Sequence, residues 1–420
     1  MRTESQYLRC YAQPEAHQVT CLTPLLTEYD NVLTVPAHAE PAEALELLSD
    51  IRGKRALAIW VVNDPQGASV AARTQTQALL SFIQKKFKPQ NFPEHGFLFA
   101  SQPDLDILCV ERTDNTTPLN PKQGVGAARK IAADIAVALA ARGYIRSRMI
   151  HCCDADTRLP QNYFTQTATS PDKRRAAAVY SFRHTLPPGP IGQAVFHYER
   201  YLRRHITGLA QAGSPYAFHS LGSTLAIDIE AYQAVRGFPL RAAAEDFYLL
   251  NKLAKVGVID RLAGAPVVLQ GRISSRVPIG TGPAVQRILA GRPPVESPPA
   301  SYLQLGIVLE HLRIAANLGT VPMVLQQQLT PDILRHLERA LQASQHPNHR
   351  LRHLHTWFDG LKTRQYLRHL QARTPCGCTA VTIRTLDEHQ LRNLQETLLV
   401  QEQRIAAGPA GVPWHVPHTE

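Results

Sequence analysis

Long hydrophobic runs are missing from this 420-residue sequence, in which no stretch approaches the ~20 consecutive apolar residues of a membrane-spanning helix. The first residues, MRTESQYLRCYAQPE, also lack the apolar core of a secretory signal peptide. These absences argue against an integral membrane protein and against a secreted one. We expect a soluble protein of the cytoplasm, for which any contact with the inner face of a membrane is peripheral.

Cysteines in the pattern of a disulfide framework or a zinc site are missing too. The sequence has seven cysteines, an odd number, and no C-x-x-C pairs at zinc spacing. Cys376 and Cys378, in TPCGCT, are too close for an easy disulfide and have no neighbouring cluster of metal ligands. We therefore expect reduced thiols, and a turn at TPCGCT.

Motifs for nucleic-acid binding are also absent, although the chain carries a formal net charge of +11. This charge attracts anions of any kind, such as the phosphates of a small donor, anionic lipid or nucleic acid. The arginines are scattered, and no zinc finger or aromatic-rich ribonucleoprotein motif accompanies them. We expect no nucleic-acid partner. The segment FHYERYLRRHI leaves open a helix at a membrane surface or a helix with solvated arginines.

What the sequence does contain is an alternation of strand and helix patterns. The stretch NVLTVPAHAEP predicts a strand ending at Pro36, PAEALELLSDIR predicts a helix, and RALAIWVVND predicts a buried strand. A helix in SVAARTQTQALLSFIQKKF follows, then strands in GFLFA and LDILCV, and an alanine-rich helix at 127–142 that Gly143 closes. Strand, helix, strand is the opening of an α/β fold.

Two aspartates follow the next predicted strand, RMIHCC. Asp154 and Asp156 lie in the loop DADTRLP at the carboxyl end of this strand, where ligands bind in open α/β sheets. In a tight turn both carboxylates can face one crevice, where they repel each other unless a cation joins them. Mg²⁺ and Mn²⁺ suit such a site, because they take few carboxylates and complete their shell with water and phosphate oxygens. The alternative is a loop of solvated aspartates that cap the next turn.

A second acidic pair, Glu245 and Asp246, opens a predicted helix in AAAEDFYLLNKL. Carboxylates in the first turn of a helix interact well with its dipole and commonly cap it. A carboxylate can also take a proton from a reacting hydroxyl group as a general base. Both interpretations fit the sequence.

Basic residues surround the start of the helix in PKQGVGAARK. Backbone amides after Gly124 and Gly126 would favour an anion at this helix terminus. Lys122 and Arg129 would add positive charge and bind phosphate there, unless they are simply solvated.

Taken in order, these segments resemble the family 2 glycosyltransferases, which are inverting enzymes with the GT-A fold. The resemblance covers roughly residues 30 to 285 and rests on VPAHAEP, VVND, PKQGVGAARK, DADTRLPQNYF and LAIDIEAYQAVRGFPLRAAAEDFYLLNKLAKVG. It implies the α/β fold of nucleotide-diphospho-sugar transferases, in which helices flank a mixed central sheet.

The resemblance also implies roles for individual residues. Asp246 would be the catalytic base, with Glu245 beside it. Asp156 would hold a Mn²⁺ or Mg²⁺ ion together with Asp154. The nucleotide and donor would contact these residues: Pro36, His38, Glu40, Asp64, Lys122, Arg129 and Asp154.

The sequence departs from the family pattern in several places. His38 stands in the first motif where the family has another residue, Gln123 interrupts the glycine pair, and Arg236 replaces the first glycine of G-G-F. The Q-x-x-R-W motif of processive polysaccharide synthases is absent, which argues against polymerisation of a sugar chain. In its place, LQGRISSRVPIGTGPAV carries Arg272 and Arg276, which would close over the donor phosphates as a lid or belong to a structural loop.

A proline-rich break, GRPPVESPPA, separates this region from several segments with helical spacing. We expect an N-terminal extension at 1–29, a GT-A domain at 30–290, an α-helical region at 291–405 and a flexible tail at 406–420. Several histidines invite a metal-binding interpretation, but fit polar faces of helices better: His346, His349, His353, His355 and His369.

The resemblance thus implies a metal-dependent enzyme that moves one sugar, with inversion, from a nucleotide-diphosphate sugar to a hydroxyl group. UDP-sugar is the favoured donor because relatives commonly use it, and the acceptor is a small or lipid-linked molecule rather than a polymer. A sugar-phosphate nucleotidyltransferase is the second hypothesis, although no G-x-G-T-R phosphate loop follows the first strand. The third is a non-catalytic binding or scaffold protein, in which we would expect the acidic motifs to be lost.

Overall fold

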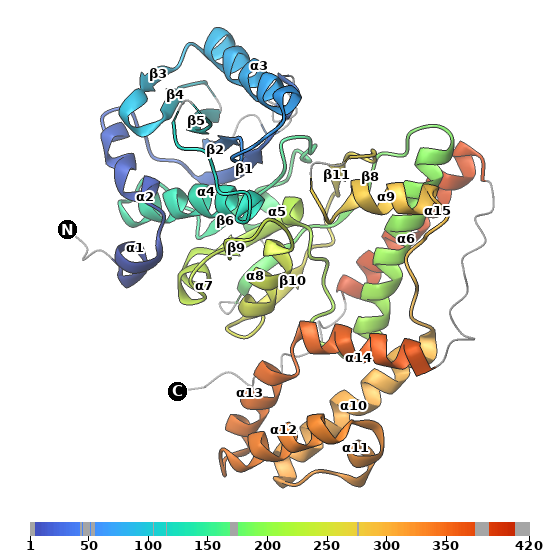
Figure 1. Ribbon diagram of the computed structural model, residues 1–420. Helices are drawn as coiled ribbons and strands as arrows, with labels where there is room; N and C mark the ends of the chain where they lie inside the picture. The colour runs from blue at the N-terminus through green and yellow to red at the C-terminus, as the bar shows by residue number, and fades with distance from the viewer. Residues whose placement is uncertain are drawn as a thin grey trace. The chain divides into compact units, whose positions relative to one another are not determined.

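The computed structural model describes residues 5–42, 44, 51, 55–103, 105–114, 116–168, 175–274, 277–373 and 386–407. The chain forms two compact units, Met1–Thr185 with Ser220–Pro283, and Leu186–His219 with Ala284–Glu420 (Figure 1). The second unit thus takes in residues 186–219, which the sequence analysis placed in the domain at 30–290.

A mixed sheet forms the centre of the first unit. Its described strands follow the order β10-β7-β9-β6-β1-β2-β5-β4-β3. Their bounds are β1 Asn31–Ala37, β2 Ala56–Asn63, β3 Gln90–Phe92, β4 Phe97–Ala100, β5 Leu105–Arg112, β6 Met149–Cys152, β7 Arg175–Val179, β9 Leu225–Asp228 and β10 Val258–Arg261. A second, parallel pair joins β8 Phe182–His184 to β11 Val267–Leu269.

Pairing in the sheet places three strand ends together. β1 pairs in parallel with both β2 and β6, and β2 pairs in parallel with β5. Antiparallel pairs join β3 to β4, β4 to β5, and β9 to β6 and β7. The strands predicted in NVLTVPAHAEP, RALAIWVVND, GFLFA, LDILCV and RMIHCC are confirmed as β1, β2, β4, β5 and β6. Because β1, β2 and β6 are parallel neighbours, their carboxyl ends lie at one edge of the sheet.

Helices flank this sheet. They are α1 Gln6–Tyr11, α2 Glu15–Gln18, α3 Val70–Phe87, α4 Gly124–Ala141, α5 Thr165–Ala168, α7 Ile229–Ala234 and α8 Glu245–Leu253. α4 packs against β1 and β2 and is buried from Gly126 to Leu139, which its many small alanine side chains permit. Gly143 follows α4 with a φ of 88° and ends it, as its sequence position predicts. The helix predicted in PAEALELLSDIR falls largely outside the described residues.

The N-terminal segment belongs to the first unit. Tyr7 of α1 donates a hydrogen bond to Asp134 of α4 at 2.5 Å, and the amide of Gln13 donates to the same carboxylate at 2.7 Å. Lys130 lies 3.0 Å from Asp134, and Tyr232 of α7 donates to it at 2.9 Å. This buried cluster fastens the start of the chain to the helix that also carries Arg129.

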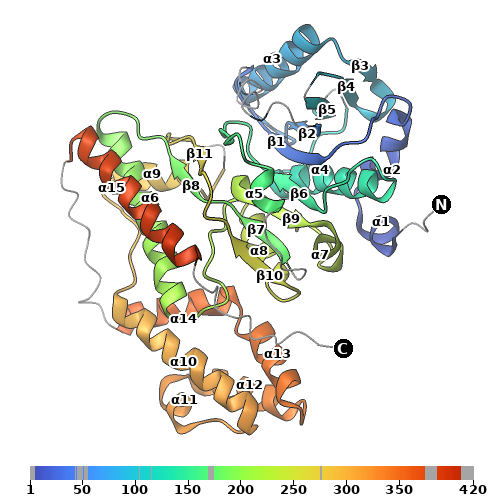
Figure 2. The ribbon, with the colours of Figure 1, turned by 180° about the vertical axis from the view of Figure 1, so that it is seen from behind.

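The second unit is helical in its described part. Its helices are α6 Pro190–Gln211, α10 Pro299–Leu318, α11 Met323–Gln328, α12 Pro331–Gln342, α13 Pro347–Trp357, α14 Gly360–Arg373 and α15 Glu388–Ala407. α9 Thr281–Leu289 enters the unit from the first one, and its Val285 and Ile288 pack against α6. Figure 2 shows α15 lying along α6, and α10 packs against α6, α13 and α14. The expected α-helical C-terminal region is therefore present.

Within the described residues, no helix combines the length and the apolar character that crossing a lipid bilayer requires. Cys376 and Cys378 lie outside the described residues.

Candidate active site

Acidic side chains gather where β1, β2 and β6 end. Glu40 follows β1, Asp64 follows β2, and Asp154 and Asp156 follow β6. All four residues are candidates from the sequence, and parallel pairing brings the loops that carry them to one edge of the sheet. Pro36 is buried inside β1, so the accessible part of this segment begins at His38.

The loops after β1 and β2 are joined by a buried network around Asp64. Nδ1 of His38 lies 3.2 Å from Oδ1 of Asp64 and 3.0 Å from the carbonyl oxygen of Asn63. The Thr76 hydroxyl donates to Asp64 at 2.8 Å and accepts from the amide of Ala39 at 3.3 Å. Asp64 is therefore placed to orient His38, and its contact with a base or ribose stays a prediction.

Arg129 joins the D-x-D loop to the second acidic pair. Its Nη2 lies 2.5 Å from Oδ1 of Asp154, and its Nε lies 3.0 Å from Oε1 of Glu245. Burial opposes the charged form of the guanidinium, but the charges of Asp154 and Glu245 outweigh it and raise the pKa of Arg129. Among the described residues, the buried Nη1 of Arg129 has no hydrogen-bond partner.

A close approach at Gly222 makes room for this arginine. A Cβ atom at position 222 would lie 2.4 Å from Nη2 of Arg129, inside any permitted contact distance. Arg129 is thus enclosed by the fold and held between two carboxylates. It is placed to orient Asp154 and Glu245, while its predicted contact with phosphate remains untested.

A second arginine contacts the other aspartate of the loop. Nη2 of Arg272 forms a short ion pair with Asp156 and lies 3.5 Å from Oε2 of Glu40. Arg272 therefore stands between carboxylates from the loops after β6 and β1. Arg276, predicted with Arg272 to close over the donor phosphates, lies outside the described residues.

The acidic pair of α8 follows a strained turn. Ala244, directly before Glu245, has a φ of 61°, a left-handed conformation that non-glycine residues rarely adopt. Ala39, directly before Glu40, has a φ of 49°. Two carboxylates of the site thus follow residues whose backbone is held in an unfavourable conformation, as is common where a fold positions functional groups.

Gly126, near the start of α4, contacts the loop that leads to this turn. The amide of Gly126 donates to the carbonyl oxygen of Arg241 at 3.0 Å, and a Cβ atom at 126 would lie 2.5 Å from the carbonyl oxygens of Pro239 and Arg241. The Gly126 amide is therefore used to fix the loop before α8, and the binding of an anion by the amides after the two glycines stays a prediction. Lys122 is exposed in the turn before α4, and its phosphate contact stays a prediction.

Asp246 has the properties of a proton acceptor near neutral pH. Burial and the neighbouring charge of Glu245 raise the pKa of Asp246 to about 7, against the opposing effects of the Phe247 amide and of Arg129. The charge of Asp154 adds to the rise, which links the base candidate to the D-x-D loop. A carboxylate with this pKa can exchange a proton at physiological pH.

Few side chains that could bind a metal ion are grouped at the site. In the part of the chain that the structure describes, no three His, Cys, Asp or Glu side chains are grouped to hold a metal ion. Asp154 and Asp156 offer hard carboxylate oxygens on one short turn, which suits a cation that brings phosphate oxygens with it. The pair does not suit a metal site made by the protein alone. The ring of His346, just before α13, lies 5.2 Å from the ring of His349 in α13, without a grouped third ligand among the described residues.

The arginines of FHYERYLRRHI are engaged inside the helical unit. Arg203 of α6 is buried between Glu199 and Glu402, while Arg200 and Arg204 both pair with Glu296. These contacts give the arginines of α6 partners within the unit. The helix is neither a row of solvated charges nor one whose charges are all available to lipid.

No family model and no curated protein matches the chain.

Proposed function

We propose that the protein is an inverting glycosyltransferase that moves one sugar from a nucleotide-diphosphate sugar to a hydroxyl group of a non-polymeric acceptor. The observation that carries the proposal is the link made by Arg129. This buried side chain joins Asp154, at the end of a central strand, to Glu245, which is next to Asp246. A candidate donor-binding loop and a candidate base are thus parts of one charged cluster.

In the proposed reaction, Asp246 receives the proton of the acceptor hydroxyl group. The acceptor oxygen forms a bond to the anomeric carbon while the bond from that carbon to the diphosphate oxygen breaks on the opposite face. One displacement inverts the configuration and needs no covalent intermediate. A pKa of about 7 lets Asp246 be deprotonated in the resting site and still hold the proton after transfer.

The surrounding residues would orient this step. Arg129 fixes Glu245, and the hydrogen bond from the Phe247 amide, at 2.7 Å, fixes the Asp246 carboxylate. Asp154 and Asp156 would hold a divalent cation, which when bound supplies positive charge against the leaving diphosphate. His38, Glu40 and Asp64 would border the nucleotide.

The GT-A fold is part of the same proposal. A mixed sheet flanked by helices, with the acidic loops at the carboxyl ends of parallel strands, supports it. UDP is the nucleotide we favour, by resemblance to family 2 enzymes. The raised pKa of Asp246 favours an enzyme over a scaffold protein, because a scaffold needs no carboxylate with a perturbed pKa.

Calorimetry of nucleotide binding tests the proposal. UDP and GDP would be titrated into the native protein with Mn²⁺, with Mg²⁺ and with EDTA, and then into Asp156→Ala. We expect UDP to bind in the presence of the cation and binding to fail in EDTA and in the variant. Asp30→Ala is the matched control, because Asp30 is an exposed carboxylate just before β1, at the opposite end of that strand from the site.

The outcomes separate the hypotheses. Nucleotide binding that needs both the cation and Asp156 supports the nucleotide-sugar site. The nucleotide that binds, UDP or GDP, identifies the nucleobase of the donor. Transfer of a nucleotidyl group from a nucleoside triphosphate to a sugar phosphate would instead support the nucleotidyltransferase. Failure of every nucleotide to bind would overturn the transferase proposal and leave a scaffold protein.

A further inference from the structure

The two aspartates of the D-x-D loop are each held by an arginine, but the two arginines are held very differently. The side chain of Arg129 is 4% exposed, has two carboxylate partners and lies against Gly222. The side chain of Arg272 is 41% exposed and comes from the irregular segment after β11. Only Arg272 can leave its aspartate without opening the core of the unit.

Hydrogen bonds hold the backbone next to Arg272 in place, so only the side chain has to move for Arg272 to leave Asp156. The amide of Gly271 donates to Oγ1 of Thr185 at 2.9 Å, and the amide of Thr185 donates to the carbonyl oxygen of Leu269 at 2.8 Å. From this anchor, Arg272 reaches Asp156 and Glu40, which belong to different loops. The guanidinium supplies positive charge between these two carboxylates and reduces their repulsion, as a bound cation would.

We infer that Arg272 is a tethered counter-ion that occupies Asp156 until a divalent cation arrives together with the diphosphate. This inference rests on the proposed function. A divalent cation entering alone must separate Arg272 from Asp156 and Glu40, and that loss weakens its binding. A cation entering with a diphosphate gives the released guanidinium a new anion within reach, because Arg272 remains anchored beside the site.

Two consequences follow for binding. The divalent cation binds weakly in the absence of nucleotide, and nucleotide strengthens its binding by more than direct contact between metal and phosphate provides. Removing Arg272 therefore makes the cation bind more tightly on its own. Substitution of a residue that merely supports the fold of the site should have the opposite effect on cation affinity, since it would weaken the binding of every ligand.

The experiment measures binding of Mn²⁺ alone, from the electron paramagnetic resonance signal of the free ion. Native protein is compared with Arg272→Ala and Arg272→Lys. We expect Arg272→Ala to tighten Mn²⁺ about fivefold, the scale of a partly exposed ion pair, and Arg272→Lys to stay near native. Circular dichroism of each variant confirms that the protein is folded.

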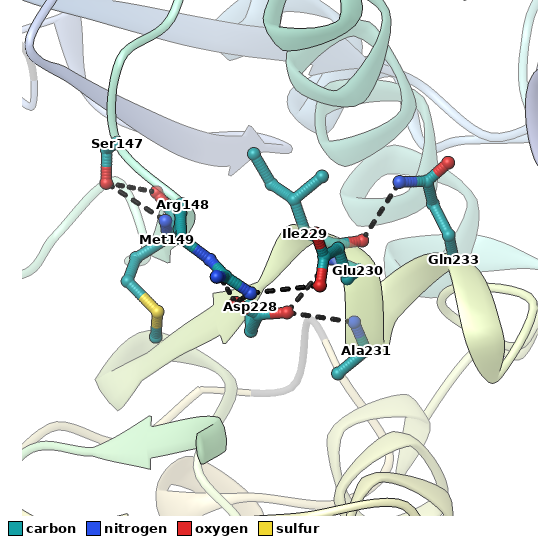
Figure 3. Close-up of polar contacts among 8 residues, drawn as sticks. All are labelled: Ser147, Arg148, Met149, Asp228, Ile229, Glu230, Ala231 and Gln233. Carbon is teal, nitrogen blue, oxygen red and sulfur yellow. Dashed lines mark hydrogen bonds and ion pairs between the residues drawn. The ribbon is translucent and has the colours of Figure 1, made fainter. Parts of the chain in front are cut away.

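A matched control comes from the amino end of the same strand. Figure 3 shows Arg148, just before β6, in contact with Asp228 and Glu230. The side chain of Arg148 is exposed and also bridges two carboxylates, at 3.2 and 3.0 Å. Asp228 in addition caps α7 through the amides of Glu230 and Ala231, so that this cluster has a structural role. Arg148→Ala should leave Mn²⁺ binding unchanged.

A second titration, with saturating UDP, measures how far nucleotide tightens Mn²⁺. This coupling should be smaller in Arg272→Ala than in native protein, because the variant has no ion pair between residue 272 and Asp156 for the nucleotide and cation to break. If Arg272→Ala leaves Mn²⁺ binding unchanged or weaker while UDP and Mn²⁺ still bind together, Arg272 is not a counter-ion that the cation displaces. The transferase proposal then still stands. If native protein binds no nucleotide with any cation, the proposed function fails, and the inference fails with it.

Discussion

Arg129 in the first unit and Arg203 in the second are both buried arginines, each held by carboxylates from two different elements. Arg203 lies between Glu199, one turn earlier on α6, and Glu402 of α15. Its Nε, Nη1 and Nη2 all donate hydrogen bonds to these carboxylates. Gln395 donates to Glu199 at 3.0 Å, so the carboxylates are satisfied as well.

The surroundings of Arg129 are less complete. Its Nη1 has no hydrogen-bond partner among the described residues, and its partner Asp154 has a side chain that is 41% exposed. Asp246 beside it has a pKa raised to about 7, whereas the pKa of Glu402 is lowered to about 2. A buried ion pair is therefore no sign of function by itself. The signs are a missing partner, a carboxyl group kept from ionising easily, and the left-handed Ala244.

The largest effect should come from Asp246→Asn. If Asp246 is the base, this variant loses on the order of 10³-fold in the rate of sugar transfer, because the amide accepts no proton. Transfer by native protein should rise with pH through about 7, as the Asp246 carboxyl group loses its proton. Single-turnover rates across this pH range provide the measurement.

The same variant has a stability readout that a damaged fold would not give. A carboxyl group whose pKa is raised by folding lowers the stability of the folded state as pH rises from its ordinary value towards the folded value. Asp246→Asn removes this cost, so its melting temperature should exceed that of native protein at pH 8 and approach it in acid. A variant that is less stable at pH 8 would contradict the assigned pKa.

Arg203→Met and Arg129→Met test the comparison directly. Arg203→Met removes the counter-ion of the buried Glu199 and one of the two charged partners of the partly buried Glu402, and should cost about 3–5 kcal/mol of stability. Arg129→Met should cost about 2 kcal/mol, because the half-exposed Asp154 can be hydrated. Urea unfolding gives both values, and calorimetry with UDP and Mn²⁺ gives binding.

For nucleotide binding we expect the two variants to rank in the opposite order, with the larger loss in Arg129→Met. Arg129→Met should lose nucleotide binding, whereas Arg203→Met, studied below its unfolding temperature, should keep it. Equal losses of binding in the two variants would mean that the two clusters are not functionally distinct.

Glu402→Gln examines the structural cluster through its pH dependence. Burial alone would raise the pKa of Glu402, but the charges of His219 and Arg203 lower it to about 2, from an ordinary value of 4.5. The ion pair therefore contributes stability that is present above pH 4.5 and is lost as pH falls towards 2. Glu402→Gln should be about 3 kcal/mol less stable at neutral pH and should lose less on acidification, as measured by urea unfolding. An unchanged acid response would show that another carboxyl group governs it.

Ala244→Gly should have the smallest effect on stability and a larger one on activity. Relief of the left-handed conformation should stabilise the fold by about 1 kcal/mol. Glycine also loosens the turn that holds Glu245 and Asp246, so transfer should slow. The control is Lys88→Gly at the end of α3, where φ is 46°; it should stabilise the protein with no change in transfer.

The sequence predicts much of this arrangement because local patterns carry it. Continuous apolar runs predict β1, β2 and β6, and turn residues place Asp64, Asp154 and Asp156 after strand ends. The partners of the carboxylates are not local. Arg129 and Glu245 are 116 residues apart, and Arg203 and Glu402 are 199 residues apart. Periodicity holds no information on which helix α6 will pack against, so the sequence gives no sign that residues 186–219 group with the C-terminal helices. The roles of Gly126 and Gly222 are equally non-local, since each depends on one close approach.

The separation between Arg203 and Glu402 has a consequence for the order in which the protein is made. A ribosome adding about 5–20 residues per second needs roughly 10–40 s to travel from one residue to the other. Until Glu402 is added, Arg203 of α6 has only one of its two carboxylate partners, whereas the first unit is complete in sequence at position 283. All residues of the candidate site can therefore have been synthesised well before Glu402, the second carboxylate partner of Arg203, is added.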